Sequence, residues 1–330
     1  MNVAIVGCGR VAAKRARALD PDRLVLCVDV EPERADRLAR SVEPPARSGA
    51  DWREAVRAAN VDALIVATPH DLLARVTREA VTHGKHVLVE KPAARRAEEL
   101  AGLPQEARAR GISVRVGFNH RFHPALARAR ALVDAGELGD LFYVRARYGH
   151  GGRTGYEREW RCDPARSGGG ELVDQGVHLI DLARWFLGDL TLHAGLAPRY
   201  FWESPVEDNA FLLLTGEAGR AAWLHASWTE WKNTFVFEIT GRKGKLEVSG
   251  LGGSYGVETL TWYRMHPELG PPECTVWDYP GDDPSWHAEM DAFRGDIAAG
   301  REPSPSLDDA IAALRIVENV YAANPATGGA

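Results

Sequence analysis

The sequence predicts an α/β protein in which an N-terminal, doubly wound parallel sheet is followed by an α+β domain with a large, mostly antiparallel open sheet. From Met1 to about His120, short apolar runs alternate with segments of helical period, which is the rhythm of βαβ units. After Pro124, aromatic and β-branched residues dominate several short runs, as half-buried strands favour. A chain of 330 residues is long enough for two hydrophobic cores, which we assign to domains at 1–120 and 121–330.

The alternation in the first domain defines its elements. Strands are expected at 2–6, 24–29, 63–67, 86–90 and 113–116, and helices at 11–19, 32–39, 52–59, 72–83 and 97–109. A further strand near 46–49 is only weakly indicated, because Pro44 and Pro45 come directly before it and proline cannot donate to a sheet.

The second domain begins with an expected helix at 125–135 and a strand at 141–148. The other expected elements are a helix at 171–187, strands at 192–200, 210–215, 221–231, 234–241 and 245–249, and helices at 286–299 and 308–323 before a frayed Gly-Ala tail.

Composition and charge exclude several classes of partner. The formal charge of -6 gives no global attraction to nucleic acid or to an anionic membrane, and no apolar run approaches the roughly 20 residues of a membrane span. The N-terminus has no basic stretch before its short apolar segment, so we expect no signal peptide. Four widely separated cysteines show no metal-binding or redox spacing, so we expect no metal and a cytoplasmic location: Cys8, Cys27, Cys162 and Cys274.

The turn after the first expected strand has the spacing of a dinucleotide-binding loop, Gly7-x-Gly9-x-x-Ala12. The first glycine allows a tight turn, the second lets the backbone approach a pyrophosphate, and the small third residue lets helix and strand pack closely. The amide groups of Arg10 and Val11, at the start of the helix, would then meet the phosphate charge. We expect a bound dinucleotide here rather than a purely structural turn.

Asp29 distinguishes between the two nicotinamide cofactors. It ends the second expected strand, 22 residues after Gly7. A carboxylate there accepts hydrogen bonds from a ribose diol and repels a 2′-phosphate, so we expect NAD rather than NADP. Asp29 could also cap the next helix, and the two roles are compatible.

Lys91 directly follows the expected strand 86–90, at the edge where open α/β sheets bind ligands. Pro92 ends that strand and restricts the backbone beside the lysine, which argues against an ordinary surface lysine. The Lys91–Pro92 bond could be cis. We expect the ammonium group to face the reacting oxygen of a substrate.

A second polar group lies on the helix expected at 171–187. Asp174, His178 and Asp181 fall on one narrow stripe between two apolar flanks. Such a stripe on a buried helix must face partners or a cleft, because unpaired buried polar groups are costly. The alternatives are a structural histidine, pairing of Asp181 with Arg184, or half of a metal site, for which no further ligands have the required spacing.

Together these motifs resemble the Gfo/Idh/MocA family, named for glucose–fructose oxidoreductase and inositol dehydrogenase. The resemblance covers nearly the whole chain and rests on the glycine turn, Thr68-Pro69-His70, Gly84 to Pro92, Gly117 to Phe122 and the helix with Asp174 and His178. It implies a Rossmann domain followed by a domain whose open sheet often makes the oligomer contact, so we expect a homodimer or homotetramer. It also implies that several residues line the cofactor cleft: Thr68, Pro69, His70, Glu90, Lys91 and Asn119. Leu73 departs from the family pattern, because many members have a histidine after the Thr-Pro segment.

The resemblance further implies hydride exchange at a sugar or polyol carbon, with Lys91, Asp174 and His178 grouped around the reacting hydroxyl. We expect His178 to take the hydroxyl proton and Lys91 to stabilise the alkoxide-like oxygen. Asp174 would orient His178 or bind a neighbouring hydroxyl. The expected activity is that of an NAD-dependent dehydrogenase acting on a CH–OH group.

The segment between Arg145 and Arg166 bears on the substrate, because six arginines and three aromatic residues alternate there with glycines. A loop of this kind could clamp a diphosphate and stack on a sugar or base, although a solvated loop explains the composition equally well. The substrate contacts that we expect are Lys91, Arg147, Tyr148, Tyr156, Trp160, Arg161, Asp174 and His178. We therefore expect a nucleotide-activated sugar, with a free sugar or a cyclitol such as an inositol as the alternative. A non-catalytic, dinucleotide-dependent sensor and an NAD-dependent glycoside-cleaving enzyme are the alternatives of other classes.

Overall fold

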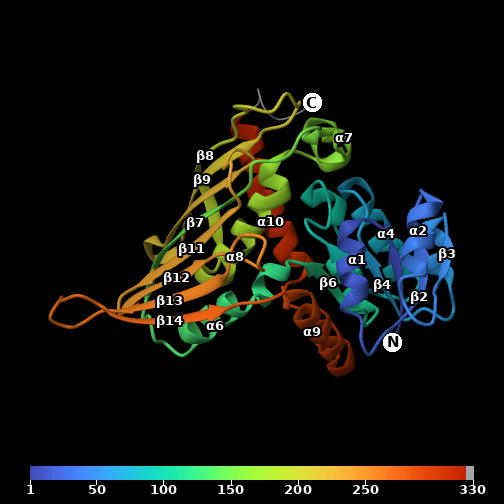
Figure 1. Ribbon diagram of the computed structural model, residues 1–330, viewed down its shortest axis with the longest axis horizontal. Coiled ribbons are helices and arrows are strands. Elements are labelled where there is room, and N and C mark those ends of the chain that lie inside the picture. Colours follow the sequence, from blue (N-terminus) through green and yellow to red (C-terminus); the bar gives the residue numbers. More distant parts are fainter. Residues whose placement is uncertain (325–330) are drawn as a thin grey trace. The chain divides into compact units, whose positions relative to one another are not determined.

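The computed structural model describes residues 1–324, so the Gly-Ala tail expected at the C-terminus lies outside the described residues. The chain forms two compact units, each assembled from separate stretches of sequence (Figure 1). Unit 1 consists of Met1–Phe118, Ala165–Gly168 and Trp286–Leu314. Unit 2 consists of Asn119–Pro164, Gly169–Ser285 and the described residues from Arg315 onward. The sequence predicts one boundary between the domains, near residue 120. In the structure, unit 1 also contains two segments that come later in the chain, Ala165–Gly168 and Trp286–Leu314.

Unit 1 is built on a six-stranded parallel sheet in the order β3-β2-β1-β4-β5-β6, which confirms the doubly wound fold. The strands are β1 (Asn2–Val6), β2 (Arg23–Val28), β3 (Arg47–Gly49), β4 (Ala63–Val66), β5 (His86–Glu90) and β6 (Val114–Gly117). The helices are α1 (Arg10–Arg17), α2 (Pro32–Ala39), α3 (Trp52–Arg57), α4 (His70–Thr82), α5 (Leu103–Ala109) and α9 (Ser285–Ala299). Strand order reverses beside β1, where ligands of such sheets bind outside the carboxyl ends of the strands.

Helix α9 is part of the first core although it lies near the end of the chain. Its Met290 and Phe293 pack in one buried cluster with Ile5 and Leu88 of the parallel sheet. A buried charged group joins the same elements. Arg15 of α1 is 1% exposed and donates from Nε to Glu90 Oε1 at the end of β5 (2.7 Å), and its Nη1 pairs with Glu289 of α9.

Unit 2 is built on an eight-stranded sheet in the order β14-β13-β12-β11-β7-β10-β9-β8. Every neighbouring pair is antiparallel except β10 and β7, which confirms the expected open, mostly antiparallel sheet. Its strands are β7 (Leu141–Gly149), β8 (Leu190–Leu196), β9 (Asn209–Gly216), β10 (Ala221–Ser227), β11 (Thr234–Gly241), β12 (Gly244–Ser249), β13 (Glu258–Arg264) and β14 (Glu273–Tyr279).

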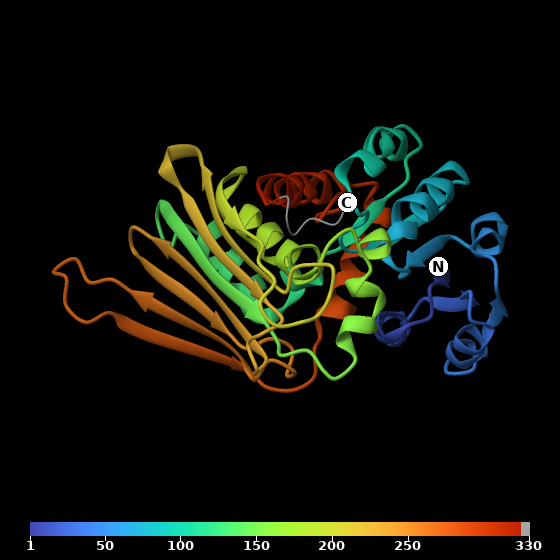
Figure 2. The ribbon, with the colours of Figure 1, turned by 90° about the horizontal axis from the view of Figure 1, so that it is seen from above.

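In the described part of unit 2, helices cover one face of the sheet. In Figure 2, α8 (Val177–Leu187) lies against the concave face. Helix α6 (Pro124–Asp134) contacts β12, β13 and β14 and is labelled beside β14 in Figure 1. The opposite face carries exposed apolar side chains, including Tyr143, Trp223 and Val276, which are 41%, 54% and 54% exposed. Among the described residues of this unit, no helix packs on that face.

Two expected helices differ from the structure for local reasons. The helix expected at 97–109 is a 3₁₀ helix, η1 (Ala97–Leu100), followed by α5, because Gly102 between them adopts φ 73° and breaks the helical path. The helix expected at 171–187 begins as a π-helical turn, η5 (Leu172–Gly176), before α8 starts.

The strand expectations were incomplete at the edge of the second sheet. Strands β13 and β14 were missed, because glycine- and proline-rich segments flank them and half of the side chains of the edge strand β14 face solvent. Within residues 1–324, no helix is both long enough and apolar enough to cross a lipid bilayer.

The buried Arg15 group predicts a large effect of a single substitution on stability. Replacing Arg15 with Met leaves Glu90 and Glu289 buried without their cation, so we expect a loss of about 3–5 kcal/mol in the free energy of unfolding. Urea denaturation followed by circular dichroism measures this loss. As a control, Arg34→Ala breaks the exposed pair with Glu31 and should change stability by less than about 1 kcal/mol. Equal effects of the two substitutions would contradict the role given to Arg15.

Candidate active site

The glycine turn in unit 1 has the shape that a dinucleotide requires. Gly7 adopts φ +88°, and a Cβ atom there would lie 2.6 Å from the carbonyl oxygen of Ala67, so only glycine fits. A Cβ atom at Gly9 would meet no atom within 4 Å, so the backbone there is open to a ligand. Helix α1 begins directly afterwards at Arg10, and its first N–H groups are available to an anion.

Asp29 is held beside this turn. Its Oδ2 accepts a hydrogen bond from the backbone N–H of Cys8 (2.7 Å), and its Oδ1 accepts one from the N–H of Glu31 (2.9 Å). Each carboxylate oxygen keeps a further lone pair, which a ribose hydroxyl could use. The turn and the carboxylate therefore fit an NAD molecule.

The predicted cofactor residues of unit 1 lie at one edge of its sheet. Gly7, Asp29, Thr68 and Lys91 follow β1, β2, β4 and β5, which are adjacent parallel strands and so end on the same side. Arg10 is exposed, and most of the other predicted cofactor residues of unit 1 are half-buried: Gly7, Gly9, Val11, Asp29, Thr68, Pro69 and Lys91. The Lys91–Pro92 peptide bond is cis.

Two predicted cofactor residues of unit 1 already have protein partners. Glu90 forms the ion pair with Arg15, and His70 donates from Nδ1 to the carbonyl oxygen of Ser167 (2.7 Å). Asn119 belongs to unit 2 and donates from Nδ2 to Ser285 Oγ (2.9 Å). The contacts of these three residues with a cofactor stay predictions.

In unit 2, Asp174 lies in the π-helical turn and His178 in the first turn of α8. The Oδ2 atom of Asp174 accepts a hydrogen bond from Arg161 Nε (3.0 Å). The ring of His178 meets that of His120 edge to face, with 3.8 Å between the ring centroids. Both catalytic candidates are buried in a polar and aromatic environment.

Asp181, by contrast, has a structural role. It accepts two hydrogen bonds from the guanidinium group of Arg121, and both side chains are at most 5% exposed. The expected alternative, pairing of Asp181 with Arg184, is wrong, because Arg184 pairs with Asp189 (2.7 Å). Of the expected polar stripe, Asp174 and His178 therefore stay catalytic candidates, whereas Asp181 holds α8 to η2 (Asn119–Phe122).

Aromatic residues form a wall beside His178. The ring of Tyr148 is 5.3 Å from that of His120 and 5.1 Å from that of Tyr255, and Gln175 Nε2 donates to the Tyr255 hydroxyl (3.3 Å). Burial raises the pKa of Tyr148 well above its ordinary value, so the phenol stays protonated. The sequence did not single out His120 or Tyr255. The position of His120 just after β6 could have indicated a site residue, because ligands bind at the carboxyl ends of such strands. Tyr255 lies in a glycine-rich loop whose sequence does not indicate a site.

The first turn of the Asp174–His178 helix is fixed by the buried carboxylate of Glu207. This carboxylate accepts hydrogen bonds from the N–H groups of Gly170 (3.0 Å) and Leu172 (3.0 Å) and from the hydroxyl of Tyr321 (2.8 Å). A Cβ atom at Gly169 would lie 2.0 Å from the Tyr321 hydroxyl, and one at Gly170 would lie 2.0 Å from the Glu207 carbonyl oxygen. The glycine run before the helix is therefore a packing requirement.

The arginine-rich segment differs from the expected cationic loop. Arg145 and Arg147 lie on β7, within the strand expected at 141–148, and pair with Glu238 (2.5 Å) and Glu230 (3.8 Å). Arg147 and Tyr148 alternate along this strand, so they face opposite sides of the sheet and only Tyr148 lies with His178.

Three of the loop arginines are also paired. Arg153 pairs with Glu159, Arg158 pairs with Glu157, and Arg161 contacts Glu159 as well as Asp174. Trp160 lies under the guanidinium group of Arg161, 4.7 Å from ring centroid to Cζ. Carboxylates therefore neutralise most of the positive charge of this segment.

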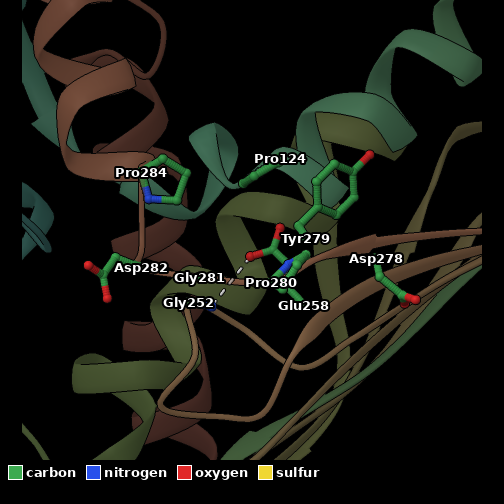
Figure 3. A pocket seen from close by; sticks show the side chains of 9 residues that line it. All are labelled: Pro124, Gly252, Glu258, Asp278, Tyr279, Pro280, Gly281, Asp282 and Pro284. Atoms are coloured by element: carbon green, nitrogen blue, oxygen red, sulfur yellow. Dashed lines mark hydrogen bonds between the residues drawn. The ribbon is translucent and has the colours of Figure 1, made fainter.

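A separate hollow of about 270 Å³ lies in unit 2 and contains none of the predicted site residues (Figure 3). Glu258 lines it, but its carboxylate accepts hydrogen bonds from the N–H groups of Gly252 (3.3 Å) and Ala125 (2.7 Å) and contacts His123 Nδ1 (2.8 Å). These bonds tie three segments together, so Glu258 supports the fold here. Across residues 1–324, no group of three His, Cys, Asp or Glu side chains is arranged to hold a metal ion.

Two family models match the chain in agreement with this geometry. The model described as an oxidoreductase family with an NAD-binding Rossmann fold matches residues 1–118. The model of the GFO/IDH/MocA C-terminal domain matches residues 126–247. Together they span well over half of the chain.

Individual relatives agree with the family models. The scyllo-inositol 2-dehydrogenase (NAD(+)) of Bacillus subtilis strain 168 is 28% identical over 264 residues, which is 76% of this chain and 74% of the relative. The dTDP-3,4-didehydro-2,6-dideoxy-alpha-D-glucose 3-reductase of Saccharopolyspora spinosa is 28% identical over 253 residues, 75% of this chain and 74% of the relative. The crystal structure of an oxidoreductase domain protein from Kribbella flavida superposes with a TM-score of 0.86 at 25% identity and covers 98% of this chain and 96% of that protein.

The Glu207 carboxyl gives stability a pH dependence. Burial raises its pKa from the ordinary value of 4.5 to about 7, so the folded protein holds this proton at higher pH than the unfolded chain does. The contribution to stability is therefore complete below about pH 4.5 and is lost as the pH rises through about 7. Relative to Glu207→Gln, the unfolding free energy of the wild type should fall by about 3 kcal/mol between pH 4.5 and 8.

Urea denaturation at several pH values measures this difference. Glu203→Gln, at an exposed carboxyl group four residues before Glu207, is the control, and its unfolding free energy should change with pH as that of the wild type does. If the unfolding free energies of the wild type and Glu207→Gln also changed equally over this pH range, the Glu207 carboxyl would not titrate as described.

Proposed function

Because the chain belongs to the Gfo/Idh/MocA family of NAD-binding oxidoreductases, we propose that it oxidises a ring secondary alcohol of a sugar or cyclitol that carries no nucleotide, or catalyses the reverse reduction. The family and its relatives establish an NAD(P)-dependent dehydrogenase acting on alcohol groups. The substrate and the roles of single residues are the proposal. The observation that carries it is the placement of Asp174 and His178 four residues apart on one buried helical segment beside a wall of aromatic side chains.

His178 acts as the acid–base group. An imidazole titrates near neutral pH, so it can take the hydroxyl proton in oxidation and return it in reduction. Arg161 donates to Asp174 and fixes the position of this carboxylate, which then binds a hydroxyl next to the reacting one. The aromatic wall of Tyr148 and Tyr255 excludes water from the imidazole.

Lys91 stabilises the oxygen of the same alcohol. Its ammonium charge opposes the negative charge that develops on the oxygen as the proton leaves. NAD, held at the glycine turn and Asp29, supplies hydride acceptance or donation at the carbinol carbon when it is bound. The proposal requires Lys91 and His178 to act on one substrate molecule.

The paired arginines favour a substrate without a diphosphate. Binding of a diphosphate by Arg153, Arg158 or Arg161 would have to displace a carboxylate that each already contacts. A neutral polyhydroxylated ring needs no such exchange. The similarity to a scyllo-inositol dehydrogenase supports the same choice.

A nucleotide-linked sugar is the second candidate, because one relative of equal identity is a dTDP-sugar 3-reductase. Free UDP or TDP separates the two candidates. A nucleotide-sugar enzyme should be inhibited competitively by one of them, whereas an enzyme for free sugars and cyclitols should not respond. Competitive inhibition at micromolar concentration would contradict the first candidate.

The catalytic roles are tested by His178→Ala and Lys91→Ala. Each should lower turnover about 10²-fold or more on the best substrate of a sugar and cyclitol panel, with the affinity for NAD nearly unchanged. Exposed residues of the same type serve as controls, in His193→Ala and Lys243→Ala, and should retain full turnover. Wild-type turnover in His178→Ala or in Lys91→Ala would disprove the role given to that residue.

We also propose that copies of the chain associate through the open face of the eight-stranded sheet, as a homodimer or homotetramer. Exposed apolar side chains such as Trp223 support this, because several of them lie on the same uncovered sheet face and such groups mark contact surfaces. Trp223→Asp should lower the mass measured by light scattering, whereas Leu269→Asp, in the exposed loop between β13 and β14, should not. A monomeric wild type would contradict the proposal.

A further inference from the structure

Two exposed aromatic side chains, which we call the aromatic platform, meet at the surface of unit 2. Phe201 follows β8 and Trp231 follows β10, and they are 57% and 63% exposed. Their rings pack edge to face with 4.8 Å between centroids. Single exposed apolar residues are common, but a packed pair of large aromatic rings in water marks a contact site.

The platform is held rigidly by its surroundings. The buried carboxylate of Asp208 accepts hydrogen bonds from three consecutive backbone N–H groups, those of Tyr200 (2.9 Å), Phe201 (2.7 Å) and Trp202 (2.9 Å). This arrangement fixes the segment that presents Phe201, so a ligand would meet a surface that is already ordered.

Trp231 is fixed in an unusual way. Its backbone adopts φ 54°, a left-handed conformation that bulky residues rarely take, and such conformations persist only where the surrounding structure holds them. A Cβ atom at Gly151 would lie 3.1 Å from the Trp231 Cα, so the glycine loop closes directly against the platform. In the sequence, Gly151 indicates only a loop, and its contact with Trp231 gives it a specific role.

Aromatic contacts lead from the platform to the surroundings of Asp174. Phe201 contacts Trp202 (5.3 Å between centroids), Trp202 contacts Tyr156 (5.8 Å), and Tyr156 contacts His150 (5.6 Å). Burial raises the pKa of Tyr156, and the negative charge of Asp174 adds to this effect, so the two groups are electrostatic neighbours. The platform therefore rests on a buried aromatic cluster whose inner member, Tyr156, is a neighbour of Asp174.

We propose that the aromatic platform is a second sugar-binding subsite, which holds a ring linked to the sugar that is oxidised. The substrate would then be a glycoside or a disaccharide; this inference rests on the proposed function. A pyranose ring has one face of C–H groups that packs on an aromatic ring, while its hydroxyls stay in contact with water and polar side chains. Exposed polar residues adjoin the platform in the sequence, Glu203 two residues after Phe201 and Lys232 directly after Trp231.

A second copy of the chain fits the platform less well. A stable protein interface buries about 800 Å² on each partner. Two partly exposed aromatic side chains offer at most a few hundred Å², since such side chains bury roughly 150–250 Å² each when fully covered. The size of the platform matches one sugar ring.

The test compares disaccharides with their monosaccharides. Cellobiose, maltose, lactose and melibiose are compared with glucose and galactose, both as substrates and as ligands in calorimetry with the full-length protein. The variants are Phe201→Ala and Trp231→Asn, the latter because asparagine tolerates a left-handed backbone. Each should weaken binding and kcat/KM for the preferred disaccharide about 10-fold and leave the monosaccharide within about 2-fold. Phe142→Ala, at another exposed aromatic residue, is the control and should change neither.

Three results would overturn the subsite. One is that no disaccharide binds the wild type more tightly than its monosaccharide. Another is an equal loss for both kinds of ligand in the platform variants. The third is a change of oligomer mass in these variants, which would make the platform an interface between copies. Failure of the proposed function gives a different result, because the wild type would then reduce no NAD with any sugar or cyclitol while disaccharide binding could still respond to Trp231→Asn.

Discussion

The candidate chemistry depends on the burial of one carboxylate beneath the helix that carries Asp174 and His178. Glu207 is fully buried and gathers two backbone N–H groups and one hydroxyl, from residues up to 114 positions away in the sequence. Burial opposes its charge, and these donors favour it. The result is a fixed starting point for the π-helical turn, so the positions of Asp174 and His178 are set before any ligand binds. Pre-organisation of this kind is what acid–base catalysis requires of its side chains.

Charge pairing shapes both units. In unit 1, Arg15 between Glu90 and Glu289 joins the first helix, the strand that directly precedes Lys91 and helix α9. In unit 2, Arg161 holds Asp174, and Arg121 holds Asp181. Carboxylates of the protein itself neutralise most of the charge of each arginine. The environment of Asp174 and His178 is therefore polar without a strong excess of positive charge. This balance suits neutral ligands rich in hydroxyl groups and, with the exposed rings of Phe201 and Trp231, favours a substrate of more than one ring.

Elements that depend on neighbouring residues could be predicted from the sequence. The strand, glycine turn and helix from Asn2 to Arg17 follow from hydrophobic period and glycine geometry, and the alternation of strands and helices after them predicts the parallel sheet. Contacts between distant segments could not be predicted this way. The Arg121–Asp181 and Glu207–Tyr321 pairs bring together residues 60 and 114 positions apart. The paired state of the arginines also depends on strand register, because it is the alignment of β7 with β11 that places Glu238 opposite Arg145.

The proposed chemistry requires His178 to exchange the proton of the substrate alcohol. The pH dependence of kcat/KM reports this exchange, measured for sugar or cyclitol oxidation by the wild type and by His178→Gln, which keeps a side chain of similar shape without a titrating ring. We expect the wild-type rate to fall on the acid side as an imidazole near neutral pH becomes protonated, and we expect this limb to disappear in the variant along with most of the activity. An unchanged acid limb in His178→Gln would show that another group carries the proton.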